Sequence, residues 1–146
     1  MARTRHKRAD RDGVRFLALP HTVLDAPAFL KLPAPAVRLL IDIARQYSGT
    51  NNGRLVACSK YLEPRGWKSH DTATRARREL EAAGLIVETR KGMRPNRAAW
   101  FAVTWAGLDW SPEMDIAKAN FERGLYRKND PLPPILKTRA LSRLTG

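Results

Sequence analysis

The clearest pattern of hydrophobic and polar positions lies between residues 59 and 105, where small apolar residues recur with helical spacing. They stand at i, i+3, i+7 and i+10, as expected for a helix that packs one narrow side on a core. These residues are Ala73, Ala76, Leu80 and Ala83. Ser69 is suited to the N-cap, Asp71 to the positive end of the helix dipole, and Gly84 to a left-handed cap. The pattern predicts a helix over residues 70–83.

The stretch before this helix predicts a second, shorter helix and a turn. The short helix is expected over residues 59–63, and the turn over residues 65–67, which read Arg-Gly-Trp. Trp67 is expected to pack in the core and hold the two helices apart, rather than to stack on a nucleic-acid base. Together these elements predict a helix-turn-helix.

A β-hairpin is predicted after the long helix. Residues 85–87 and 99–105 are β-prone, and residues 91–97 between them combine turn residues with positive charges. Alternation in the second run places three side chains on the face that seals the core: Phe101, Val103 and Trp105. Trp100 falls on the other face and is expected to be exposed, against a helix or a partner. Residues 54–56 are expected to supply a short first strand.

Residues 34–47 predict the longest helix outside this region, the first of three that pack together. Its inner side is expected to be apolar and its outer side charged. The expected inner residues are Ala36, Val37, Leu40, Ile41, Ala44 and Tyr47. The expected outer residues are Arg38, Asp42 and Arg45, of which Arg38 and Asp42 form an i,i+4 pair.

Weaker patterns flank these elements. Residues 14–24 predict a short strand or an extended segment, and Asp25 is expected to cap a short helix over residues 26–30. Near the other end, an apolar stripe predicts a helix over residues 112–125. That helix either packs back on the domain or pairs with its copy in a homodimer. The stripe consists of Met114, Ala117, Phe121 and Leu125.

Several short runs accompany the order helix, turn, helix and basic hairpin. They are Asn-Asn-Gly at 51–53, Arg-Gly-Trp-Lys-Ser at 65–69, Arg-Glu-Leu-Glu-Ala-Ala-Gly-Leu-Ile at 78–86, Val-Glu-Thr-Arg-Lys-Gly at 87–92 and Ala-Val-Thr-Trp at 102–105. With these runs the chain resembles winged-helix proteins of bacterial phages, plasmids and genomic islands, and more distantly replication-initiator and MarR-type winged helices. The resemblance covers roughly residues 16–110. It implies an α+β, mainly helical fold, with a three-helix core and a β-hairpin wing.

The expected organisation has four parts. Residues 1–13 form a basic, flexible arm with few apolar residues, and residues 14–110 form the winged helix-turn-helix domain. Residues 111–126 contain the C-terminal helix. Residues 127–146 form a basic tail in which prolines favour an extended chain.

Charge narrows the class of partner. The chain of 146 residues has 27 Lys and Arg against 14 Asp and Glu, a net charge of +13 and a pI near 10.9. Such an excess is typical of proteins that bind nucleic acid or an anionic membrane. No run approaches the roughly 18 apolar residues of a membrane span, and no apolar stretch follows the basic N-terminus as in a secretory signal. We expect a cytoplasmic, nucleoid-associated bacterial protein that makes no membrane contact.

The sequence does not predict an enzyme. The histidines, His6, His21 and His70, lie far apart, and the acidic residues form no cluster for two-metal chemistry. No glycine-rich phosphate-binding motif is present, and the single cysteine, Cys58, excludes an internal disulfide and a multi-cysteine zinc site. We therefore expect no catalytic residue, no metal and no small-molecule cofactor.

Contacts with double-stranded DNA are expected from the helix over residues 70–83 and from the hairpin loop. A helix in the major groove contacts base edges near its N-terminus, while its neighbours bind phosphate. The expected contacts in and before the helix are Lys68, Ser69, His70, Thr72, Thr74, Arg75 and Arg78. Arg75 is the first choice for a bidentate contact to guanine. The expected loop contacts, to the backbone or the minor groove, are Lys91, Arg94 and Arg97.

The basic arm has two interpretations. It either follows DNA, through Arg3, Arg5, Lys7 and Arg8, or serves only to keep the chain soluble.

The function predicted is that of a DNA-binding protein that regulates transcription on a bacterial mobile element. Alternatively it is a replication-initiator or partition-type DNA binder. Two further alternatives stay open. One is an RNA-binding or ribosome-associated basic protein, which would recognise A-form shape. The other is a winged-helix adaptor that binds protein through Trp100 and the helix that contains Phe121.

Overall fold

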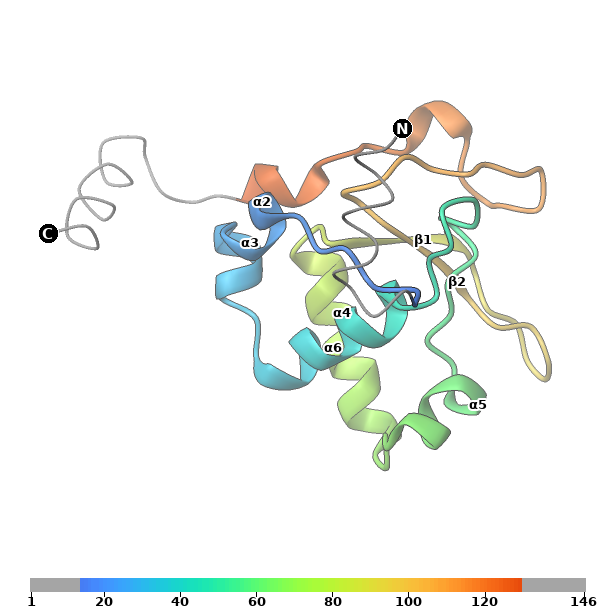
Figure 1. The fold of residues 1–146 in the computed structure, drawn as a ribbon. Helices are drawn as coiled ribbons and strands as arrows, with labels where there is room; N and C mark the ends of the chain where they lie inside the picture. The colour runs from blue at the N-terminus through green and yellow to red at the C-terminus, as the bar shows by residue number, and fades with distance from the viewer. Residues whose placement is uncertain (1–13, 130–146) are drawn as a thin grey trace, which may run out of the picture.

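The computed structural model describes residues 14–129, so the expected N-terminal arm and most of the expected C-terminal tail lie outside the described residues. The α-helices are α2 (His21–Leu24), α3 (Pro27–Leu30), α4 (Ala34–Ala44), α5 (Ser59–Leu62) and α6 (His70–Ala82). The strands are β1 (Ile86–Arg90) and β2 (Trp100–Val103). Short 3-10 helices are η1 (Glu63–Arg65), η2 (Lys118–Asn120) and η3 (Leu125–Asn129). The expected α+β class, with more helix than strand, is confirmed (Figure 1).

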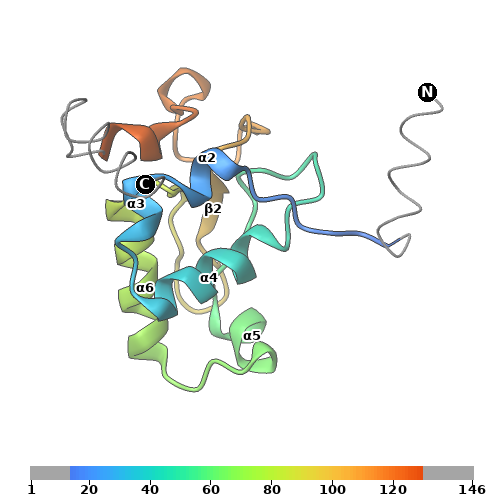
Figure 2. The ribbon, with the colours of Figure 1, turned by 60° about the vertical axis from the view of Figure 1, so that its left-hand side comes forward.

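Helices α4 and α6 cross at the centre of the core (Figure 2). The predicted stripe of small residues on α6 makes the approach close, because Ala76 and Leu80 are completely buried. The completely buried apolar residues of α4 are Ala36, Leu39, Leu40 and Ile43. Burying an aliphatic side chain contributes about 1.5–3 kcal/mol, so this crossing holds the fold together.

Helix α6 begins and ends where its sequence predicts. The Oγ of Ser69 accepts a hydrogen bond from the backbone N–H of Thr72 at 3.2 Å, which makes Ser69 the N-cap. Gly84 has a φ of +73°, the left-handed conformation expected after the helix. The position of α6 in the chain is therefore encoded locally.

The expected division of α4 into an apolar and a charged side is wrong at two positions. Asp42 is 4% exposed, whereas Ile41 is 42% exposed. Asp42 does not pair with Arg38, because its carboxylate accepts hydrogen bonds from Arg65 and Trp67 in the turn before α6. The helix also stops at Ala44, since the following turn has bonds of the 3-10 type.

The predicted β-hairpin is present. Strands β1 and β2 are antiparallel, with Ile86 opposite Val103 and Glu88 opposite Phe101. The expected first strand is reduced to one bridge, in which Leu55 pairs with Phe101. The core face is as predicted for Phe101 and Val103, which are buried, while Trp105 is only partly buried.

The loop at residues 51–53 is fastened to the segment after β2 by one amide side chain. Asn52 is completely buried, and its Oδ1 accepts a hydrogen bond from the N–H of Val103 at 2.8 Å. Its Nδ2 donates to the carbonyl oxygens of Val103, Ala106 and Gly107 at 2.9–3.2 Å. The loop over residues 51–53 therefore has a role in tertiary structure.

The N-terminal segment forms two short helices in place of a strand. Residues 15–20 belong to no helix or strand, which agrees with the second of the two expectations, an extended segment, but residues 21–24 form α2. Asp25 is the C-cap of α2 and does not cap the next helix, because Ala26 occupies the N-cap of α3. Pro27 stands at the start of α3, where a proline is tolerated.

The C-terminal helix expected over residues 112–125 is absent, and so is a C-terminal helix within residues 111–126. Apart from η2 and the first residues of η3, these residues are irregular. Tertiary bonds replace helical ones: the N–H of Asp115 donates to Thr89 O and the N–H of Gly124 to Thr104 O. Met114 packs so closely on Gly53 that a Cβ there would lie 2.6 Å from its Cε. The segment, drawn in orange in Figure 1, runs along the top of that view through turns and the 3-10 helix η2.

Candidate nucleic-acid interface

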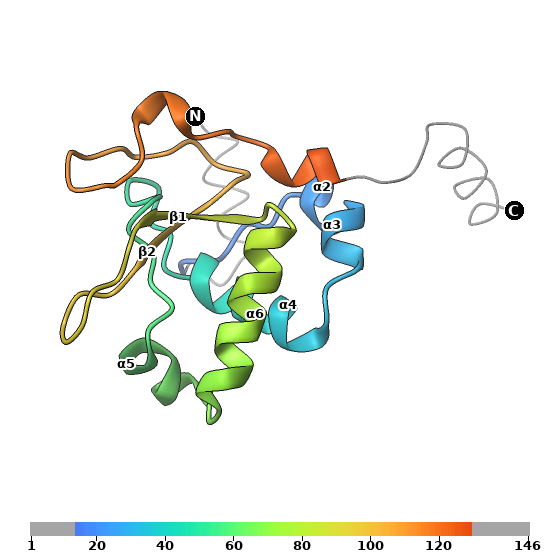
Figure 3. The same cartoon turned by 180° about the vertical axis from the view of Figure 1, so that it is seen from behind.

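One long side of α6 is free of other elements. Seen from behind, α6 lies in front of the rest of the described chain, with the hairpin loop and α5 beside it (Figure 3). At 100° per residue, Asp71, Arg75 and Arg78 stand at i, i+4 and i+7 opposite the buried Ala76 and Leu80. All three side chains are exposed. The geometry of α6 thus presents one carboxylate and two guanidinium groups in a row.

The residues expected to contact DNA from this part of the chain are mostly exposed. The exposed ones are Lys68, Ser69, His70, Thr72, Arg75 and Arg78. Ser69 is already occupied as the N-cap, so its hydroxyl oxygen is engaged by the helix. Thr74 is half-buried and lies in a groove of about 310 Å³ between α5 and α6, which His70 and Arg77 also line. Lys68, Ser69 and His70 also line this groove, whereas Arg75 and Arg78 do not. We call Asp71, Arg75 and Arg78 the outer row of α6.

The charges on α6 differ in whether they are paired. On its flank, Arg77 forms a salt bridge with Glu81 at 3.0 Å, an i,i+4 pair. Within residues 14–129, neither Arg75 nor Arg78 makes a side-chain hydrogen bond or an ion pair. Asp71 and Arg75 have the same i,i+4 spacing as Arg77 and Glu81, but they do not pair. The outer row is therefore available to a partner.

The hairpin loop, residues 91–97, is exposed throughout. Its two sides are joined by backbone hydrogen bonds between Met93 and Arg97, at 2.8 and 2.9 Å. The backbone N–H of Lys91 donates to the carboxylate of Asp115 at 2.7 Å. These bonds fix the backbone of the loop while leaving the cations of Lys91, Arg94 and Arg97 on its surface.

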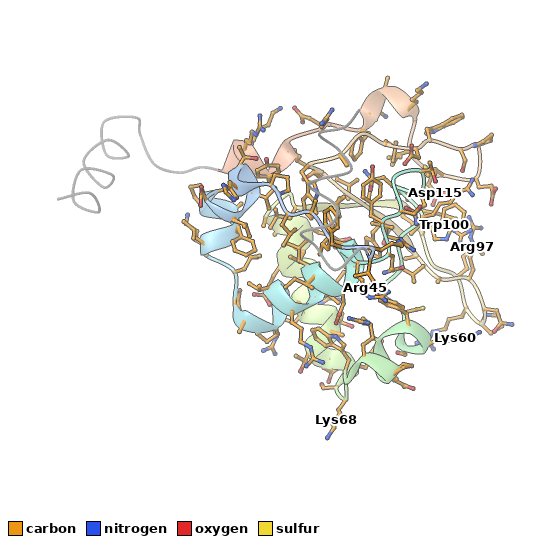
Figure 4. The ribbon with its side chains drawn as sticks, viewed as in Figure 1. Arg45, Lys60, Lys68, Arg97, Trp100 and Asp115 are labelled. Carbon is orange, nitrogen blue, oxygen red and sulfur yellow. The ribbon has the colours of Figure 1, made fainter. Side chains whose placement is uncertain are left out.

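The base of the loop contains a stacked group that sequence reasoning missed. The guanidinium of Arg90 lies 3.5 Å from the ring centroid of Trp100, and that of Arg54 lies 5.6 Å from it. Burial and the nearby charge of Arg97 lower the pKa of Arg90. Trp100 is consequently half-buried by its own chain rather than exposed to a partner, which corrects the expectation for this residue (Figure 4).

The turn before α6 is held by the buried Asp42. Its Oδ1 accepts from Arg65 Nε and its Oδ2 from Trp67 Nε1, both at 2.6 Å. The hydrogen bond between Asp42 and Arg65 raises the pKa of Arg65. Arg38 adds a bond to the carbonyl of Arg65 at 2.6 Å, and its guanidinium lies 5.2 Å from the Trp67 ring centroid. The expectation that Trp67 is a core residue is confirmed, since it is 8% exposed.

Lys60 is a further exposed cation that the sequence analysis did not select. It belongs to α5, and Figure 4 shows Lys60 and Lys68 at the lower end of the molecule, with Arg97 on the hairpin above them. The sequence signal that could have selected Lys60 is its positive charge within the short helix that precedes the turn. Leu62, two residues later, is buried, so Lys60 lies on the opposite, outer side of α5.

The described residues do not meet the requirements for a metal site or for a membrane-spanning helix. No group of three or more His, Cys, Asp or Glu side chains within residues 14–129 is arranged to hold a metal ion. Across the same residues, no helix has the length and apolar character needed to cross a membrane. Cys58 is a free thiol at the half-buried N-cap position of α5.

Comparison of the chain with protein-family models, with curated proteins and with solved structures found no match.

Proposed function

We propose that the chain is a winged helix-turn-helix protein that binds double-stranded DNA. In this assignment α4, α5 and α6 are the three helices, and the hairpin loop over residues 91–97 is the wing. Leu55 lies between α4 and α5 in chain order, and its bridge to Phe101 is at the place in the chain where the first strand of a winged sheet is expected. The order of elements and the contact of α4 with α6 support this class.

The observation that carries the DNA assignment is the unpaired outer row of α6. Arginines that fold against acidic neighbours contribute little to binding, whereas Arg75 and Arg78 are exposed and unpaired within the described residues. A planar guanidinium is matched to the O6 and N7 of guanine in the major groove. We therefore assign base contacts to α6, and phosphate contacts to Lys68 and to the wing residues Lys91, Arg94 and Arg97.

The biological role we propose is regulation of transcription on a bacterial mobile element. It rests on the resemblance of residues 51–53, 65–69, 78–92 and 102–105 to winged-helix proteins of such elements. Replication initiation or partition is the second role that this resemblance supports. Binding sites that overlap a promoter, with reporter expression that changes with the protein, would support regulation. Clustered repeats with no effect on the reporter would favour the second role.

The test of DNA binding is selection from random-sequence duplexes by the full chain, repeated at two salt concentrations. We expect an enriched sequence and an affinity that falls as salt rises, since bound cations are released from the backbone. A palindromic sequence would indicate a dimer. Salt-sensitive binding without enrichment, and with preference for double-stranded RNA, would replace this proposal with RNA binding. Absence of binding at moderate salt would contradict both.

Three alanine variants separate the expected roles. Arg75→Ala should lose discrimination at one base pair by about 1–3 kcal/mol, because it removes a bidentate base contact. Lys91→Ala should weaken binding to all duplexes and reduce the slope of log K against log salt by about 0.9, as expected for one phosphate contact. Arg123→Ala is the matched control, because this exposed arginine lies near Trp105, beyond the end of β2 opposite the wing.

A further inference from the structure

The outer row of α6 contains one residue that is unfavourable for binding a polyanion in general. Asp71 is exposed and shares the face of Arg75 and Arg78, one helical turn before Arg75. A carboxylate on this face is repelled by phosphate groups. Unless it makes a favourable contact with the DNA, Asp71 therefore lowers the affinity that the two arginines provide.

No side chain within residues 14–129 forms an ion pair with Asp71. An acidic residue four positions before a basic one is the favourable orientation for a helical ion pair. Arg77 and Glu81 pair at 3.0 Å although their order is the reverse one, whereas within residues 14–129 Asp71 forms no ion pair with Arg75. Asp71 and Arg75 thus project separately, one as an acceptor and the other as a donor.

We infer, on the basis of the proposed DNA binding, that Asp71 determines specificity by accepting a hydrogen bond from the N4 amino group of a cytosine. An ionised carboxylate has acceptors only, and in the major groove cytosine offers a donor while guanine offers acceptors. Asp71 precedes Arg75 by four residues, about 6 Å along the helix axis. That distance corresponds to about two base pairs at 3.4 Å each. The target then contains a cytosine within two base pairs of the guanine bound by Arg75.

This assignment also explains how the protein rejects other DNA. Where no amino group meets Asp71, its carboxylate loses water without gaining a partner and stays close to phosphate. The attraction of the net charge of +13 for every duplex is therefore opposed at all sites except those with the correct base. Asp71 lowers general affinity and raises selectivity.

The experiment compares sequences selected from random duplexes by the wild-type chain, Asp71→Ala and Asp71→Asn. The wild type should prefer cytosine at one position by about 5- to 150-fold, the range of a good base contact. Asp71→Ala should lose this preference and bind unrelated duplexes more tightly than the wild type. Asp71→Asn should shift the preference toward adenine, because an amide matches its N6 and N7. The position bound by Arg75 is identified independently with Arg75→Ala.

Two controls keep the inference separate from helix stability and from the proposed function. Asp25→Asn removes the same charge at an exposed site on α2 and should leave the selected sequence unchanged. Thermal unfolding of each Asp71 variant, followed by circular dichroism, shows that α6 is folded under the conditions of selection. If the Asp71 variants and the wild type select the same sequence, Asp71 serves only the helix dipole and the inference is wrong. If the wild type binds no duplex, the proposed function fails instead.

Discussion

At the scale of single residues, Asp42 connects the core helix to the surface that we assign to DNA. It is 4% exposed, yet its carboxylate receives bonds from both Arg65 and Trp67, and its backbone oxygen receives the hydroxyl of Tyr61 at 2.6 Å. A buried carboxylate needs such partners, because without them its charge is stabilised neither by water nor by a hydrogen-bond donor. Asp42 therefore fixes the turn from which α6 starts.

Asp42→Asn is expected to destabilise the fold by about 2–3 kcal/mol. The amide loses the ion pair with Arg65, and its NH₂ group faces one of the two donors that the carboxylate accepted. Denaturant unfolding of both proteins measures the difference. Asp25→Asn, at an exposed position, should stay within about 0.5 kcal/mol of the wild type. A loss below that value in Asp42→Asn would show that the bonds to Asp42 contribute little.

The free energy of unfolding is expected to depend on pH through the carboxyl group of Glu88. Burial, followed by the charge of Glu81, raises the pKa of Glu88. The folded state then binds the proton more tightly than the unfolded state, so Glu88 contributes stability at low pH that is lost as pH rises through the folded pKa. At pH 7 the charged Glu88 opposes folding.

Glu88→Gln should consequently raise the melting temperature at pH 7. The gain should disappear near pH 3, below the ordinary glutamate pKa of about 4.3, because the wild-type side chain is then neutral in both the folded and the unfolded state. Thermal unfolding at the two pH values tests this. An equal gain at both values would attribute the effect to packing and not to charge.

At the scale of elements, local sequence signals were sufficient where they were strong and mutually consistent. Helix α6 has a capping serine, an acidic residue in its first turn, a stripe of small residues and a glycine after its last turn. The hairpin has β-prone runs around a loop rich in turn residues. The bounds of α6 were predicted nearly to the residue, because both of its ends are specified by neighbours in the chain. The hairpin was predicted as an element, but β1 extends three residues further and β2 ends two residues earlier than expected.

Ser69→Ala should cost about 1 kcal/mol of stability, the usual value for removing an N-cap side chain. The N–H of Thr72 then loses its partner at 3.2 Å and depends on water. Ser59→Ala, at an exposed serine for which no capping bond is present in α5, provides the comparison. Chemical denaturation should separate the two variants, and equal losses in both would remove the assigned role of Ser69.

The predicted C-terminal helix failed because one apolar stripe was the only signal for it. Pro112 and Gly124 stand at its ends, and Gly124 has a φ of +82°, which a right-handed helix does not permit. The backbone N–H groups of Asp115 and Gly124 gain partners in the sheet region instead. The expected homodimer depended on pairing of this helix with its copy. The described residues contain no such helix.

At the scale of the whole molecule, distant segments are joined by few polar bonds in buried places. Asn52 joins the loop after α4 to the end of β2, 51 residues away, and Tyr126 OH contacts Thr22 Oγ1 at 3.2 Å across 104 residues. Tyr126 is 1% exposed, so η3 packs on the short helices α2 and α3. These hydrogen bonds hold the loop after α4 against the end of β2, and η3 against α2.

Asn52→Ala should destabilise the protein by more than about 3 kcal/mol. Each buried polar group left without a partner costs about 1–3 kcal/mol, and the N–H of Val103 and the carbonyl of Val103 both lose one. Asn120→Ala, at an exposed position in η2, should have a small effect. Equilibrium unfolding measures both, and a small effect of Asn52→Ala would mean that water replaces the amide.

The sequence by itself determined the elements whose signals are local: α4, the short α5, α6 with its cap, the hairpin and its basic loop. It also selected most of the exposed residues beside α6, since helical periodicity separates the buried side from the outer one. Tertiary structure alone decided that Asp42 is buried, that Trp100 is covered by Arg90, and that residues 112–125 follow the sheet instead of forming a helix. The reason is physical. Periodicity reports the side of a helix that is apolar on average, but the partner of a buried carboxylate or an irregular backbone lies in a segment distant in the chain.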